Sequence, residues 1–114
     1  MKVRNLTPHE VNVVDDCGNA VATFPSEGVA RAAQNDVVVG ALEVEGGSVP
    51  VVKTEFGDPQ DLPEPEEGVQ LIVSFITVSA AKAAGRTTAD LLTTSQPVRD
   101  DQGRIVGCRA FAQQ

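Results

Sequence analysis

Turn-forming residues separate short valine-rich runs through most of this chain, and this alternation constrains the fold more than any other feature of the sequence. Such turns lie at 15–19, at Gly46 and Gly47, and at 100–103. Asp, Asn and Gly suit these places because they tolerate positive φ or bond their own backbone. Each turn therefore predicts an antiparallel hairpin. A strand at 2–6, ended by Thr7 and Pro8, predicts that the chain opens as an antiparallel meander.

A proline-rich, acidic stretch at 57–68 interrupts the strands, and we expect an exposed loop there that could close over a ligand. Beyond it, 69–73 predicts a buried strand, and an alanine-rich helix near residues 75–84 should stop at Gly85. The pattern predicts an α+β, mostly β fold in which antiparallel hairpins form a small sheet with one short helix. Residues 1–114 should form a single domain, small enough for oligomerisation to help its stability.

The core of such a fold has to be aliphatic, because the chain has four Phe and neither Trp nor Tyr. Valine-rich runs favour sheet over helix. No run approaches the roughly 18 apolar residues of a membrane span and no export signal opens the chain, so we expect a cytoplasmic protein without a membrane partner. In that compartment Cys17 and Cys108 are expected to be reduced, partly buried thiols.

Charge is distributed unevenly along the chain. The net charge of −7 argues against a partner that is a nucleic acid polymer, since phosphate backbones require a basic face. Residues 1–81 hold four basic and thirteen acidic residues, whereas 82–114 hold five basic and three acidic ones. A local basic site on an acidic body suits a compact anion better than a long polymer.

Arginines dominate this basic segment. Arg99 and Arg104 flank the turn at 100–103, where two like charges facing each other are unfavourable unless something offsets them. An anion held between the two guanidinium groups would do so; neighbouring acids that screen them at the surface are the alternative. Arg109 follows five residues after Arg104, which in a regular strand places it on the opposite face. A bulge at Gly107, or a dimer in which Arg109 completes the partner's pocket, would resolve that opposition.

Asn5, Thr7 and His9 alternate along the opening strand and its turn. Side chains on alternate residues share a face, so these three could offer hydrogen bonds to a base or a ribose. The alternative is that they satisfy backbone groups of the turn beside Pro8.

Four aromatic rings are present, and a purine ligand would stack on one of them. Most phenylalanines in a small domain belong to the core. Phe56, at the start of the acidic stretch, is least like a core position.

No catalytic or metal-binding motif is present in the sequence. His9 is the sole histidine, which excludes a histidine-rich zinc site, and the acids near 61–67 resemble a metal site by count alone. We therefore expect no catalytic residues, no metal and no cofactor, and we favour a binding protein over an enzyme.

Five short motifs occur in order along the chain: Asn-Leu-Thr-Pro-His at 5–9, Ala-Arg at 30–31, Pro-Val-Val-Lys-Thr at 50–54, Gly-Arg at 85–86, and Pro-Val-Arg-Asp-Asp-Gln-Gly-Arg-Ile-Val-Gly-Cys-Arg at 97–109. In a chain of this size they resemble a family of small phage and prophage proteins, the Thoeris anti-defence sponges. The resemblance implies a single nucleotide-binding domain in a homo-oligomer, a dimer or a hexamer. Such a protein sequesters cyclic ADP-ribose isomers in the host bacterial cytoplasm without cleaving them, and some members also look able to hold cyclic oligonucleotides at a separate site.

The resemblance also implies site residues. Phosphate groups would be bound by arginines, for which the candidates are Arg31, Arg99, Arg104 and Arg109. Arg86 and Thr87 stand where a polar contact from the loop after the helix would be, and Phe56 or Phe75 would be the stacking ring. The alternatives are an enzyme that degrades such a nucleotide and a small phage structural or interaction protein.

Overall fold

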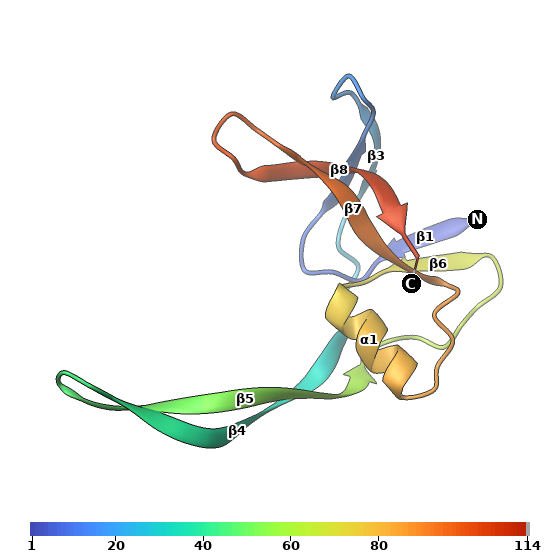
Figure 1. The fold of residues 1–114 in the computed structure, drawn as a ribbon. Helices are drawn as coiled ribbons and strands as arrows, with labels where there is room; N and C mark the ends of the chain where they lie inside the picture. Colours follow the sequence, from blue (N-terminus) through green and yellow to red (C-terminus); the bar gives the residue numbers. More distant parts are fainter. Residues whose placement is uncertain (114) are drawn as a thin grey trace.

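The computed structural model describes residues 1–113, which form a β-rich body with one long projecting hairpin (Figure 1). The body is a six-stranded sheet in the order β1–β6–β7–β8–β2–β3, and the projecting hairpin is a separate two-stranded sheet. The strands are β1 Lys2–Asn5, β2 Val11–Val14, β3 Ala20–Phe24, β4 Arg31–Val44, β5 Gly47–Gln60, β6 Val69–Ile72, β7 Leu91–Arg99 and β8 Ile105–Ala112, with the helix α1 at Phe75–Ala83.

The α+β, mostly β fold with one short helix is confirmed. Three antiparallel hairpins, β2–β3, β4–β5 and β7–β8, form at the three predicted turns. The opening meander is wrong, because β1 pairs in parallel with β6 rather than with β2. Parallel pairing also joins β6 to β7 and β2 to β8, so the body sheet is mixed.

Two apolar clusters stabilise the body from opposite sides of β6. Leu71 faces a cluster that includes Val78 and Ala81 of α1, whereas its neighbour Ile72 faces a second cluster with Cys108. Successive side chains of a strand point to opposite faces, so one short buried strand serves both clusters. Phe24 and Phe111 pack at the second cluster with ring centroids 6.1 Å apart, which assigns two of the four aromatic rings to the core.

Helix α1 begins at Phe75, directly after its N-cap. The Ser74 hydroxyl accepts a hydrogen bond from the Thr77 backbone N–H, which satisfies one of the free donors of the first turn. At the other end Gly85 has a φ of +84°, the left-handed conformation that ends a helix. The buried Thr77 hydroxyl donates to the Ala30 carbonyl at 3.1 Å and so fixes the segment that leads into β4.

Asn5 is fully buried and holds three segments together. Its Nδ2 donates to the backbone oxygens of His9 and Phe24 at 2.8 Å each, and its Oδ1 accepts from the Thr7 backbone N–H at 3.0 Å. The backbone of Asn5 also bridges to Ser26, which brings β1 beside the end of β3. The two edge strands of the sheet are thereby drawn toward each other.

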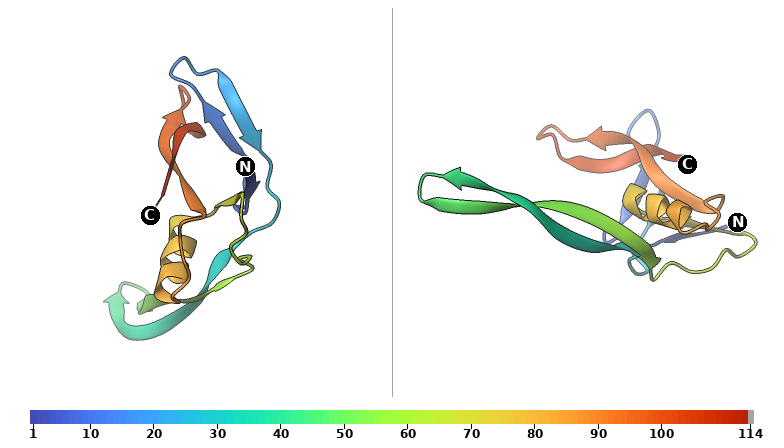
Figure 2. Two further views of the ribbon diagram at one scale, coloured as in Figure 1. Left: turned by 90° about the vertical axis from the view of Figure 1, so that its right-hand side faces the viewer. Right: turned by 60° about the horizontal axis from the view of Figure 1, so that its bottom comes forward.

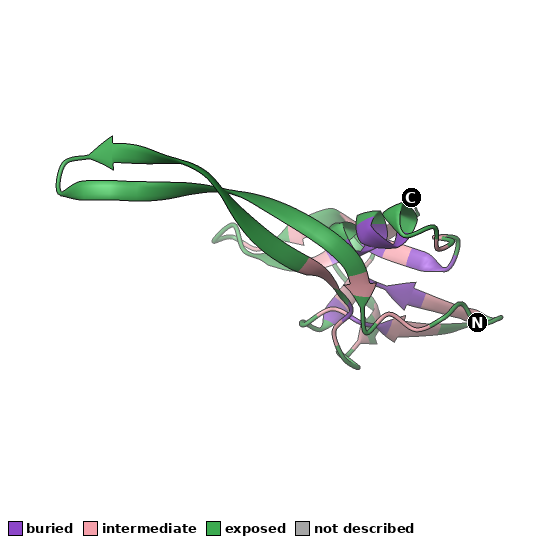
Figure 3. Cartoon of the chain, turned by 90° about the horizontal axis from the view of Figure 1, so that it is seen from below, coloured by how far each residue is buried: buried purple, intermediate pink, exposed green. Residues whose placement is uncertain are grey.

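The β4–β5 hairpin, called the arm below, projects away from the body (Figures 1 and 2). Its strands have 14 residues each and are exposed along almost their whole length (Figure 3). The radius of gyration is 17.7 Å, against about 13 Å for a compact domain of this length. The arm therefore makes the molecule extended.

The expected loop at 57–68 is wrong in its first part, because residues 57–60 continue β5. The following residues are tied to the body: Leu62 packs against the first apolar cluster, and the Pro63 carbonyl accepts a hydrogen bond from Arg86. A stretch anchored in this way is not a free lid.

Replacing Asn5 with alanine should lower the free energy of unfolding by about 3 kcal/mol. The change removes the amide partners of two part-buried groups, the Phe24 carbonyl and the Thr7 backbone N–H, and each such group costs about 1–3 kcal/mol. Urea unfolding measures the loss. Asn35→Ala, at an exposed position of the arm, is the control and should change it by less than about 0.5 kcal/mol. Equal losses in the two variants would contradict the role of Asn5.

Candidate functional site

An open groove of about 1150 Å³ lies between the β7–β8 hairpin, β2 and the start of α1. Its polar lining comes from the turn before β2, from the N-cap of α1 and from β7, and its apolar lining from β2, the end of β6, α1 and β8. The polar residues include Thr7, His9, Glu10, Ser74, Thr93, Thr94 and Ser95, and the apolar ones include Val11, Val73, Phe75, Ile105 and Val106. A surface of this kind can bind a flat apolar group and hydrogen-bond its edges.

The groove exists because β2 and β8 meet at one point and then separate. They pair only at Val13 and Cys108, and the two hairpins that contain them point in different directions beyond it (Figure 1). Gly107 makes the contact possible, since a Cβ there would lie 3.0 Å from the Asn12 carbonyl oxygen. The bulge expected at Gly107 lies next to it: the register passes from Val98 opposite Gly107 to Arg99 opposite Ile105 and leaves Val106 unpaired.

The turn at 100–103 holds its two flanking arginines in different ways. Arg104 Nε donates to Asp100 Oδ2 at 3.0 Å, and Arg99 Nη1 donates to the Gly103 carbonyl at 2.8 Å. Arg104 lies within the turn and outside the paired ladder, so the two arginines are not a facing pair. For Arg104, the screening by a neighbouring acid is what the structure shows.

Asp100 organises this turn. Its Oδ1 accepts from the backbone N–H groups of Gln102 and Arg104 at 2.9 and 3.0 Å. The hydrogen bond from the Arg104 backbone N–H is the main cause that lowers the pKa of Asp100, and burial partly opposes it. Hydrogen bonds from the Gln102 backbone N–H and from the Arg104 side chain lower the pKa further. Because the pKa is lowered on folding, the carboxylate stabilises the turn above the usual carboxyl range and loses that effect as the pH falls.

Arg86 is an internal clamp. Its two terminal nitrogens bond both oxygens of Asp90 at 2.9 and 3.0 Å and the carbonyls of Thr87 and Pro63 at 2.7 Å each. Both side chains of the pair are largely buried. The Thr87 hydroxyl accepts from the Ala89 backbone N–H within the same exposed loop. The terminal nitrogens of Arg86 are therefore engaged in hydrogen bonds that stabilise the fold.

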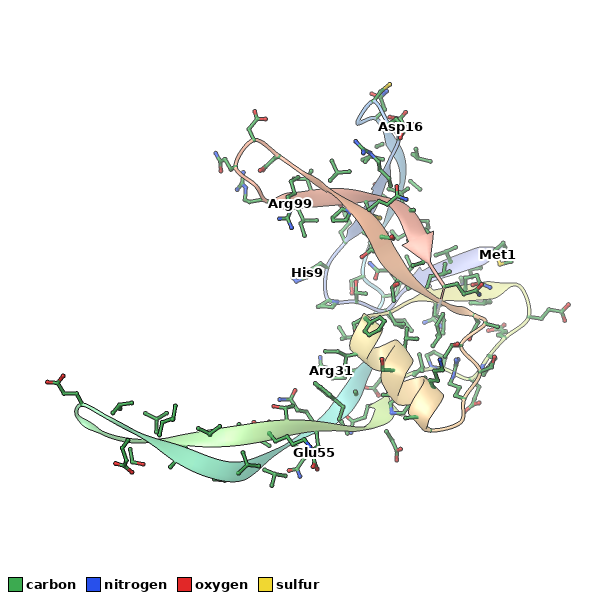
Figure 4. All side chains as sticks on the ribbon, in the orientation of Figure 1. Met1, His9, Asp16, Arg31, Glu55 and Arg99 are labelled. Carbon is green, nitrogen blue, oxygen red and sulfur yellow. The ribbon has the colours of Figure 1, made fainter. Side chains whose placement is uncertain are left out.

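Arg31 and Arg109 lie exposed on separate elements, Arg31 at the base of the arm and Arg109 on β8. Among residues 1–113 neither has an ion-pair partner. In the view of Figure 4, His9 lies between the hairpin that carries Arg99 and the base of the arm that carries Arg31. Within one chain, none of the five arginine candidates lines the groove.

Phe56 and Phe75 are brought together. They line a smaller apolar cleft of about 390 Å³ between the arm and α1, with Ile76 and three small residues of the helix. Phe75 is 61% exposed and borders the groove as well. Of all the site residues expected from the sequence, Phe75 alone contacts both hollows.

Asn5, Thr7 and His9 divide between the two roles considered for them. Asn5 and the Thr7 hydroxyl form internal hydrogen bonds, and Thr7 and His9 also line the groove. Sequence reasoning missed the hydroxyl groups of β7 and the Ser74 cap. For the hydroxyl groups of β7, the sequence signal was the run Thr93–Ser95, in which three polar residues follow Leu91 and Leu92.

Comparisons with family models, with curated proteins and with solved structures found no match to this chain. Within residues 1–113 no group of three or more His, Cys, Asp or Glu side chains could hold a metal ion. No helix in the described part of the chain is long and apolar enough to cross a membrane. The groove and the exposed arm are the surface features that bear on function.

Arg86→Ala should destabilise the protein by about 3 kcal/mol or more, because it leaves the buried Asp90 carboxylate without its partner. Urea unfolding again gives the value. Arg109→Ala removes an exposed arginine, and its free energy of unfolding should stay within about 0.5 kcal/mol of that of the parent protein. A stable Arg86→Ala protein would show that the clamp is dispensable for folding.

The two free cysteines should react differently with a thiol reagent. Cys17 is exposed, but Cys108 is buried, and burial raises the pKa of the Cys108 thiol, which lowers its reactive thiolate fraction at neutral pH. Ellman's reagent should titrate one thiol promptly in the native protein and the second only in denaturant. Prompt reaction of both would mean that the β2–β8 contact opens readily.

Proposed function

We propose that this chain is a binding protein that sequesters a cyclic nucleotide signal, a cyclic ADP-ribose isomer or a cyclic oligonucleotide, without cleaving it. The observation that carries the proposal is the groove, whose volume of about 1150 Å³ is slightly above the roughly 300–1,000 Å³ of most small-ligand sites. An exposed phenyl ring, Phe75, stands at one end, and hydroxyl groups line β7. Stacking a base on such a ring contributes about 1–3 kcal/mol.

Phosphate recognition is the second part of the proposal. A sponge has to keep nearly every copy of its ligand bound, which requires a dissociation constant near nanomolar, about −12 kcal/mol. Ion pairs with phosphate supply much of that energy when they are desolvated. Arg31, Arg99 and Arg109 have no acid partner among residues 1–113, but they lie outside the groove of their own chain. We therefore propose that the site is completed in a homo-oligomer, a dimer or a hexamer, by arginines of a second copy.

A second candidate is a small phage structural or interaction protein. Two observations favour it: Arg86 and Arg104 are matched to acids of the same chain, and the arm exposes many apolar side chains. In that case the arginines are surface or packing residues, and the groove binds no nucleotide.

Calorimetry with cyclic ADP-ribose isomers and cyclic oligonucleotides tests the proposal. We expect nanomolar binding to at least one of them, and chromatography of the released ligand should return it unchanged. Arg99→Ala combined with Arg109→Ala should weaken binding at least about 100-fold, because each charged hydrogen bond contributes about 1.5–3 kcal/mol. Lys82→Ala, on the exposed side of α1, removes the same type of charge and should leave the affinity unchanged.

The outcomes separate the three classes of function. Absence of binding to every cyclic nucleotide rejects the sponge and favours the interaction protein. Product in excess of the protein identifies an enzyme, for which His9 and Glu10 in the groove would be the first groups to replace. Wild-type affinity in the double arginine variant rejects the phosphate role of these two residues.

A further inference from the structure

The arm exposes apolar side chains that a monomer leaves in water. Eight of them are between 38% and 66% exposed: Val37, Val38, Val39, Leu42, Val44, Val49, Val51 and Val52. An isolated two-stranded hairpin is marginally stable in water, because it buries little on either face. Each strand also has a free outer edge along its length, which is a surface that pairs or aggregates unless it is covered.

One face of the outer half of the arm is continuously apolar. Leu42 stands opposite Val49, and Val44 and Val51 are two residues further along each strand, so these four side chains share a face. The opposite face of the same segment carries Glu43 and Ser48 together with Ala41 and Pro50, and Val38 and Val52 continue it toward the body. In the outer half of the arm, the face with Leu42 and Val49 is therefore the more apolar of the two.

The body has an uncovered apolar surface of its own, called the docking surface below: Phe75 and Ile76 of α1, with Ile105 and Val106 of β8. These side chains are 46–61% exposed. Phe75, Ile105 and Val106 border the same groove, so the docking surface consists of two apolar patches, on α1 and on β8, that face one opening. The base of the arm in the same chain adjoins α1 at Phe56, but the rest of the arm projects away from the body (Figure 1), and Phe75 and Ile76 remain 61% and 46% exposed.

We propose that the arm of one chain docks on the docking surface of a second copy of this chain, and that two copies exchange arms reciprocally. Full burial of a valine or leucine removes on the order of 100 Å² of apolar surface, so the five half-exposed side chains on this face, Val37, Leu42, Val44, Val49 and Val51, offer about 250 Å² per arm. With the surface it covers, one arm buries about 500 Å². Two exchanged arms bury about 1,000 Å², the least that a specific interface needs, which one arm alone does not reach.

The distribution of charge also favours a second copy of this chain as the partner of the arm. Residues 31–60 contain five acids against Arg31 and Lys53, with Glu43 and Glu45 near the tip, whereas the segment 82–114, which includes β8, is net positive. Arg99 and Arg109 lie on the hairpin that supplies Ile105 and Val106. Opposite charges on an arm and its docking surface guide association and fix orientation. The inference does not depend on a nucleotide, since it needs none to be present.

Light scattering coupled to size-exclusion chromatography, on the full chain without ligand, tests the exchange. The parent protein should be a dimer or a multiple of one. Leu42→Glu with Val49→Glu, and separately Ile105→Glu, should raise the dissociation constant at least about 100-fold, because a charge would be buried in each interface. Val21→Glu, at a 66% exposed valine of β3, is the matched control and should leave the oligomer intact. A monomeric parent protein, or an arm variant that stays associated, overturns the inference.

Cross-linking identifies the contact partners. In a Cys17→Ser background, Val49→Cys and Val106→Cys proteins are mixed and treated with a short bis-maleimide. A linked dimer containing one chain of each kind is expected. Linkage of Val49→Cys chains to each other, without linkage to Val106→Cys chains, means that the arms pack on one another and overturns the docking surface. Circular dichroism of each variant confirms folding, which is expected because every changed side chain, Cys17 included, lies outside the apolar clusters.

Discussion

The buried amide of Asn5 is the interaction on which the arrangement of the body depends. It satisfies carbonyls from the turn after β1 and from the end of β3, two segments that have no strand pairing with each other. A buried polar group is tolerated only when its partners are all in place, so the amide specifies one path for the chain there. That path sets Thr7 and His9 at the groove and leads the chain through the buried Ala30 into the arm.

The hairpins followed from local chemistry and the rest of the topology did not. A turn such as Gly46–Gly47 pairs the two strands on either side of it, so the sequence alone indicates which neighbouring strands form a hairpin. The parallel partner of β1 lies more than sixty residues away, and a four-residue strand carries no signal for so distant a register. The valines of the arm gave a different error. Apolar residues predict burial, but in this chain these valines are exposed.

The arginine segment shows why clustering along a sequence differs from clustering in space. Arg86 finds Asp90 four residues later and Arg104 finds Asp100 four residues earlier, so two of the candidates are satisfied within a single loop or turn. The polar part of the groove comes largely from small hydroxyl residues, which are common in strands and do not indicate a binding site in the sequence. Only the three-dimensional structure shows that these residues line one groove, because the groove forms where β2 and β8 separate.

The arm joins the body at neighbouring points, since Arg31 and Gln60 are paired at its base. Its length is therefore free to change in evolution without disturbing the aliphatic core. Insertions of two residues in each strand would extend its reach by about 7 Å and keep every side chain on its face, whereas a single insertion would invert the pattern beyond it. Natural variants of this chain should thus differ in reach by even steps, which in the proposed assembly would correspond to different spacings between subunits.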